Sequence, residues 1–282
     1  MKRGLRQKSG GFTILETIIV LTVTIALLGS TLALFQQRIP RTQFTKAVNE
    51  LSVRLTDVAN QVAVGNYPGA SDTICSVSSG VPTLNTGGSG MGTNQDCIFL
   101  GQAIGFGPNG CTGVGGECDK AKVFTIFGLR QVVDVSGVTK VATKLSEAAP
   151  TTDINKATQE YDNGYGLSVK KIFVGINTYS GIAYVQSFGS GINASGDAEG
   201  SQQVSIIPVN TTTLGLDFDD FAGKINSGNL TNVNPVSGIT ICLKSGTTNQ
   251  YAVLVLGANG NATDIQQRIL DYAEWSGPYG CT

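Results

Sequence analysis

The chain has 282 residues, of which 41% are hydrophobic and 14% are charged, and it contains no histidine. The hydrophobic fraction excludes an intrinsically disordered protein. The absence of histidine removes the commonest general base and metal ligand. Because no GxSxG or SxxK arrangement stands in a suitable context either, we expect a protein that is not an enzyme and needs no cofactor.

The N-terminus divides into a basic stretch and an apolar one. Residues 1–11, MKRGLRQKSGG, carry four basic side chains and no acid, so the rest of the chain has 15 basic and 20 acidic side chains and a net charge of −5. We therefore expect no nucleic-acid partner. Residues 12–35 would form a helix of roughly 36 Å, long enough to cross a membrane. By the positive-inside rule, the basic end stays in the cytoplasm and the later residues are exported.

Glu16 is the one charged residue in this apolar run. A carboxylate inside a bilayer costs about 2.5–3.5 kcal/mol near the centre and less near an end. Two interpretations follow: a side chain solvated at the headgroup boundary, or a functional charge. We favour the second, because charged residues within membrane segments are rare and usually functional.

The sequence GGFTILE, followed by the long apolar run, resembles the N-terminus of the type IV pilins and of the related type II secretion pseudopilins. Precursors in this family carry a short basic leader that ends in glycine, then an aromatic residue, a glutamate as the fifth residue of the mature chain, and a long apolar helix. This sequence has all of these features: the basic charge of the leader, the glycine, the aromatic residue, the spacing of the glutamate and the length of the apolar run.

The resemblance implies that a prepilin peptidase cuts between Gly11 and Phe12 and that the new amino group of Phe12 is methylated. It also implies that Glu16 meets the positively charged N-terminus of a neighbouring subunit during filament assembly. This pairing is physically reasonable, since a carboxylate in an apolar bundle is costly until an opposite charge lies within a few Å.

Beyond the apolar run, the helical pattern continues with a single apolar face. We expect one helix over residues 12–65, with 12–35 spanning the membrane and the remainder packed on a head domain. Pro40 is expected to kink this helix, and Gly65 and Pro68 to end it. The predicted buried face consists of Phe44, Val48, Leu51, Leu55, Val58 and Val62.

Residues 66–282 read as an exported, β-rich head domain. Residues 66–120 are rich in Gly, Ser, Thr and Asn, interrupted by a first strand at 97–106. We expect a hairpin across residues 245–248 and a short helix over 262–275, capped by Thr263 or Asp264. A long helix packed on an antiparallel sheet gives an α+β, pilin-like fold. The remaining predicted strands are 122–135, 170–178, 181–188, 203–209, 238–245 and 250–257.

All six cysteines lie on the expected exported side. An even count there indicates three disulfides, although six cysteines allow 15 pairings. Our prediction pairs Cys75 with Cys97, Cys111 with Cys118, and Cys242 with Cys281. The last pair is similar to the C-terminal disulfide loop of many pilins. Zinc is the alternative, but there is no CxxC pair.

Acidic and aromatic side chains supply the other candidate sites. Asp217, Asp219 and Asp220 are possible oxygen ligands for Ca²⁺, but the EF-hand pattern is absent, and we favour a turn with solvated acids. Six aromatic residues could form an adhesive surface, although packing or scattered exposure is the simpler interpretation of each. They are Tyr161, Tyr165, Tyr179, Tyr184, Trp275 and Tyr279.

These observations favour a structural subunit of a type IV pilus or pilus-like filament, serving attachment or twitching motility. Its expected partners are copies of itself, other pilins, the prepilin peptidase and assembly machinery, the membrane, and a host-cell or surface receptor. It would wait in the cytoplasmic membrane and then become extracellular. The alternatives are a pseudopilin of a type II secretion system and an uncleaved, single-pass membrane-anchored binding protein.

Overall fold

The computed structural model describes residues 13–65, 73–78, 81–86, 97–106, 120–133, 136–152, 159–186, 204–209, 221–223, 225, 238–246, 248–258 and 261–281. The chain separates into two compact units, Met1–Gln43 and Phe44–Thr282. Helix α1, Ile14–Ala63, contributes to both units and has Pro40 inside it. The class is α+β, as expected from the sequence.

In the first unit, residues Ile14–Thr31 of α1 form a segment that is long and apolar enough to cross a membrane. None of this segment is buried within the structure. A signal sequence near the N-terminus would meet the same criteria of length and composition.

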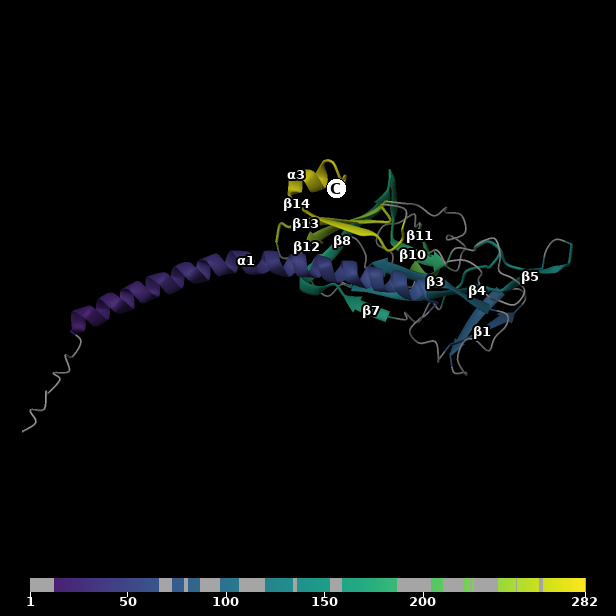
Figure 1. The fold of residues 1–282 in the computed structure, drawn as a ribbon, viewed down its shortest axis with the longest axis horizontal. Coiled ribbons are helices and arrows are strands. Elements are labelled where there is room, and N and C mark those ends of the chain that lie inside the picture. Colours follow the sequence, from purple (N-terminus) through teal and green to yellow (C-terminus); the bar gives the residue numbers. More distant parts are fainter. Residues whose placement is uncertain are drawn as a thin grey trace, which may run out of the picture. The chain divides into compact units, whose positions relative to one another are not determined.

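The second unit contains two five-stranded antiparallel sheets (Figure 1). We call the first the β3 sheet; its strands lie in the order β11-β10-β3-β4-β7. Its strands are β3 (Cys97–Phe106), β4 (Lys120–Leu129), β7 (Gln159–Asp162), β10 (Gly181–Gln186) and β11 (Val204–Val209).

The second sheet, called the β12 sheet, has the order β14-β13-β12-β8-β9. The predicted hairpin is present as β12 and β13, which pair in antiparallel register. A short 3-10 helix, Gly164–Gly166, leads into β8. The strands are β8 (Leu167–Val174), β9 (Asn177–Tyr179), β12 (Ile239–Ser245), β13 (Tyr251–Leu256) and β14 (Ile265–Leu270).

Two small hairpins complete the described strands. They are β1 (Thr73–Ser78) with β2 (Val81–Thr86), and β5 (Gln131–Val133) with β6 (Thr139–Val141). The first hairpin lies in the stretch that the sequence analysis treated as loop. Neither of its strands carries a long apolar run, so their pairing left a weak sequence signal.

The main hydrophobic core lies around the second part of α1. All six residues of the predicted apolar face are buried, with at most 4% of each exposed. They share one cluster with side chains from both sheets, and Figure 1 shows this part of α1 running across strands of both. The 3.6-residue periodicity therefore identified the packed face of the helix correctly.

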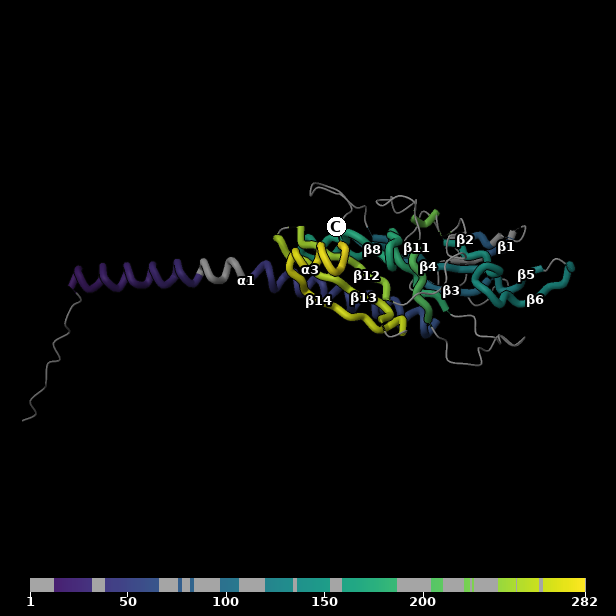
Figure 2. The backbone as a smooth tube through the Cα atoms, turned by 90° about the horizontal axis from the view of Figure 1, so that it is seen from above, coloured from purple at the N-terminus to yellow at the C-terminus, as the bar shows by residue number. Residues whose placement is uncertain are grey.

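Two further cores cover the outer faces of the sheets. On the β3 sheet, Phe221 packs over Gly105 and Gly181, which are directly opposite each other. An added Cβ at these glycines would lie 2.8 Å and 2.5 Å from the Phe221 ring, so both positions require glycine. The other core joins the β12 sheet to helix α3, Tyr272–Ser276, seen beside β13 and β14 in Figure 2.

The predicted helix over residues 262–275 is wrong. Residues 265–270 instead form strand β14, which pairs along the whole of β13 from Tyr251↔Leu270 to Leu256↔Ile265. The short α3 follows, and its N-cap is Asp271, whose carboxylate accepts a 2.8 Å hydrogen bond from the Glu274 backbone N–H. Pairing is favoured here because β14 supplies backbone partners to the edge of β13 that β12 leaves open.

Two predicted strands are each divided. The stretch 122–135 is broken at Arg130, after which β5 turns away to pair with β6. The stretch 170–178 is a hairpin of β8 and β9 around Gly175, whose φ of +58° favours glycine.

Candidate assembly segment

The first turn of α1 is capped by Thr13. Its side-chain Oγ1 accepts a 3.3 Å hydrogen bond from the backbone N–H of Glu16. The spacing Thr13-x-x-Glu16 is that of a capping box, and an acid in the first turn also interacts favourably with the helix dipole. Glu16 thus has a local structural role beside the assembly role predicted for it, and the T-x-x-E spacing was the sequence signal for it.

The hydroxyl side chains of the apolar segment are satisfied inside the helix. Thr17, Thr22, Thr24, Ser30 and Thr31 each donate to a backbone carbonyl three or four residues earlier, at 2.8–3.2 Å. Such bonds remove the need for water as a partner. The side chains of Ile14–Thr31 therefore present hydrocarbon to the surroundings, with one exception, the Glu16 carboxylate.

The Glu16 carboxylate has no hydrogen-bond or ion-pair partner in the part of the chain that the structure describes. The apolar side chains around it are more than half exposed. An exposed apolar surface of this extent marks contact with a membrane or another protein. Among the residues that the structure describes, the segment therefore lacks both a cover for its side chains and a cation for its carboxylate.

The predicted processing site and the candidate Ca²⁺ ligands lie outside the described residues. This applies to Gly11 and Phe12, and to Asp217, Asp219 and Asp220. Within the described residues, no group of three or more His, Cys, Asp or Glu side chains is arranged to hold a metal ion.

The disulfide predicted between Cys242 and Cys281 is present. The two Cα atoms are 5.7 Å apart and 39 residues apart in sequence, and the bond ties the end of the chain to a central strand. Cys97 is also disulfide-bonded. The side chains of Cys75, Cys111 and Cys118 lie outside the described residues, so the other two pairings stay predictions.

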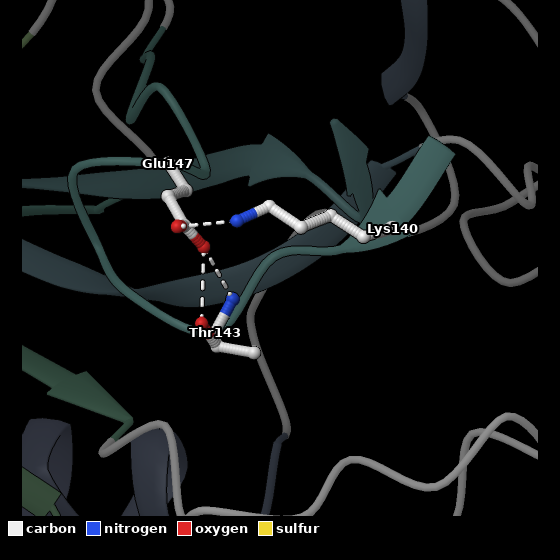
Figure 3. Close-up of polar contacts among 3 residues, drawn as sticks. All are labelled: Lys140, Thr143 and Glu147. Atoms are coloured by element: carbon white, nitrogen blue, oxygen red, sulfur yellow. Dashed lines mark hydrogen bonds and ion pairs between the residues drawn. The ribbon is translucent and has the colours of Figure 1, made fainter. Parts of the chain in front are cut away.

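A strongly shifted carboxylate can mark a chemical site, and Glu147 has such a shift. Its carboxylate accepts hydrogen bonds from the Thr143 backbone N–H at 2.9 Å, from Thr143 Oγ1 at 3.1 Å and from Lys140 Nζ at 2.9 Å (Figure 3). These donors, the backbone one foremost, lower the pKa of Glu147 to about 2. The group closes a surface loop after β6 and is saturated with donors, so its role is structural.

The six aromatic residues do not gather into one surface. Tyr179, Tyr184 and Trp275 are buried in the cores. Tyr161 and Tyr165 instead contact basic side chains of α1: Arg54 lies 4.6 Å from the ring centre of Tyr161, and Lys46 5.7 Å from that of Tyr165. Core packing was therefore the correct interpretation for half of them.

The described geometry thus contains one segment that is incomplete without another molecule, the N-terminal part of α1, and a self-contained second unit. No protein-family model, curated protein or solved structure matched this chain.

Proposed function

We propose that this chain is a structural subunit of a type IV pilus or pilus-like filament, assembled through the N-terminal part of α1. The observation that carries the proposal is the combination in residues Ile14–Thr31: hydroxyls satisfied within the helix, exposed apolar side chains, and a single carboxylate without a partner in the described chain. The leader and GGFTILE pattern supports the same conclusion.

In this proposal the surroundings of the segment change once during assembly. Lipid covers the apolar side chains before assembly, and neighbouring copies of the same helix cover them afterwards. Glu16 gains its cation when the amino group of Phe12 of an adjacent subunit comes within a few Å. Because only one axial placement of the incoming subunit makes this ion pair, the pair sets the register of assembly.

The second unit supplies the exterior of the filament. Its α1 residues bury one face on two sheets, and its C-terminus is held by the Cys242–Cys281 disulfide. Such a head suits an exported structural role in attachment or motility.

The first experiment is intact-mass and N-terminal analysis of protein recovered from cell membranes and from sheared surface material. A chain that begins with methylated Phe12 in the sheared fraction supports the proposal. A chain that still begins at Met1 and stays in the membrane contradicts it and favours the membrane-anchored binding protein. Filament length then distinguishes a pilus subunit from a secretion pseudopilin.

Variants at the helix start separate the charge of Glu16 from the cap that Thr13 provides. Glu16→Gln keeps the side-chain shape but removes the charge, whereas Thr13→Ala removes the cap and keeps the charge. If pairing drives assembly, Glu16→Gln reduces filament yield at least tenfold with normal cleavage, and Thr13→Ala has a small effect. Asp57→Ala, at an exposed acid on the second part of α1, is the matched control. Equal losses in Glu16→Gln and Thr13→Ala would contradict the pairing role.

A further inference from the structure

Two fully buried polar side chains meet where the end of α1 lies on the β3 sheet. Gln102 of β3 and Tyr184 of β10 are directly opposite each other, so their side chains share one face of the sheet. Both are 0% exposed. That face is the one turned toward α1, because the amide Nε2 of Gln102 donates to Oε1 of Gln61 on the helix at 3.4 Å.

Each of the two side chains has a polar atom without a partner. The Tyr184 hydroxyl and the Gln102 Oε1 are both buried and make no hydrogen bond. Burial raises the pKa of the Tyr184 phenol, so its hydroxyl keeps its proton and remains a donor. Buried polar atoms are nearly always hydrogen-bonded in folded proteins, often to ordered water. Because these two unpaired atoms belong to residues directly opposite each other, we look for one partner that both could bind.

The groups without a partner match the hydrogen bonds that one water molecule can make. Tyr184 offers one donor, and Gln102 Oε1 offers one acceptor. Gln61 Oε1 has a second lone pair, because an amide oxygen has two and one accepts from Gln102. A water molecule accepts from the first and donates to the other two. Three hydrogen bonds are the typical number for a buried water.

We propose that a single structural water molecule is bound between Tyr184, Gln102 and Gln61, and that it joins the last turns of α1 to the β3 sheet. A metal cation does not suit this place, because the phenol hydroxyl is a neutral donor and no carboxylate is present among the three groups. The neighbouring Gln186 completes the attachment: its Nε2 donates to the Val62 carbonyl at 3.0 Å, in the last turn of the helix.

A consequence is that this water exchanges slowly while the helix end is docked. Both strand residues are fully buried and Gln61 is half-buried, so lifting the end of α1 would open the site to solvent. The residence time of the water therefore reports the opening of the helix–sheet contact.

A high-resolution structure of the full chain tests the site directly. We expect density for one oxygen within hydrogen-bond distance of Tyr184 Oη and Gln102 Oε1. Either a dry contact or a direct hydrogen bond between these two side chains would overturn the proposal.

Substitution of Tyr184 provides a second test, in which the direction of the change in stability shows whether the hydroxyl binds water. If the hydroxyl binds water, Tyr184→Phe lowers the folding equilibrium constant of the full chain in detergent about three- to tenfold. If the hydroxyl is dry and unpaired, the same change raises the constant. Tyr179→Phe is the control, because Tyr179 belongs to the same core and its hydroxyl is not among the buried atoms that lack a partner. Oxygen-17 relaxation should show a long-lived water in the wild type and its loss in Tyr184→Phe.

Discussion

The first and second parts of α1 differ in how their apolar side chains are covered. Between Ile14 and Thr31, apolar side chains lie on every side and all are exposed. Between Phe44 and Val62, they form one stripe that the two sheets bury, while charged residues such as Lys46 and Asp57 are exposed. The second part is covered by other parts of its own chain, whereas the described residues provide no cover for the first.

The largest expected effect comes from removing apolar volume in each part. Leu55 is 1% exposed, so Leu55→Ala should lower the free energy of unfolding by about 2–5 kcal/mol, through lost burial and a cavity. Leu27→Ala should leave unfolding of the second unit unchanged. Denaturant titration of the full chain in detergent checks both variants, and equal losses would contradict the comparison.

A lysine placed at equally exposed positions should also separate the two parts. Leu27 is 60% exposed and Val53 is 61% exposed. Leu27→Lys should cost about 2.5–3.5 kcal/mol in an apolar surrounding and block membrane insertion, while Val53→Lys should change stability by less than about 0.5 kcal/mol. Membrane fractionation measures the first effect. Membrane fractionation of Leu27→Lys equal to that of the wild type would contradict the placement of Leu27 in the hydrocarbon interior.

A smaller effect is expected at the caps of the two helices. Asp271→Ala removes the hydrogen bond to Glu274 and should lower the free energy of unfolding of the second unit by about 1 kcal/mol. Thr13→Ala should not change that value, because its helix start belongs to the first unit. Thermal unfolding followed by circular dichroism measures both.

The smallest effect is a dependence on pH confined to the second unit. The folded pKa of Glu147 is about 2, below its ordinary value of 4.5. Its stabilising contribution is therefore fully present above about pH 4.5 and is lost as the pH falls toward 2. Glu147→Gln should reduce the loss of stability over this range. An identical acid profile in the variant would show that the loop contact does not contribute.

The sequence predicted those parts of the fold in which one pattern dominates. The buried face of α1 was correct because its apolar residues recur with helical period and charges occupy the other face. The stretch 262–275 was wrong because Ile265, Ile269 and Leu270 are compatible with both a helix and a strand, and the need of β13 for a partner decided between them. The pattern within the stretch itself carries no information about pairing with the strand before it.

The candidate functional residues also differ in whether the sequence predicted them. The apolar segment and its glutamate were visible because a long hydrophobic run and a lone charge are properties of adjacent residues. The proximity of Gln61, Gln102 and Tyr184 could not be predicted from the sequence, because only strand pairing and helix docking bring these residues together. Asp271 was not predicted as a cap, because the predicted helix over residues 262–275 placed it inside the helix.

The packing of the second part of α1 on both sheets has a mechanical consequence. Polar contacts attach it on one side to β14, through Asn49 and Gln267, and on the other to β3 and β10, through Gln61 and Val62. A force that pulls on the helix would have to slide it past both sheets at once, breaking these contacts together rather than one after another. A head built in this way resists tension as a unit.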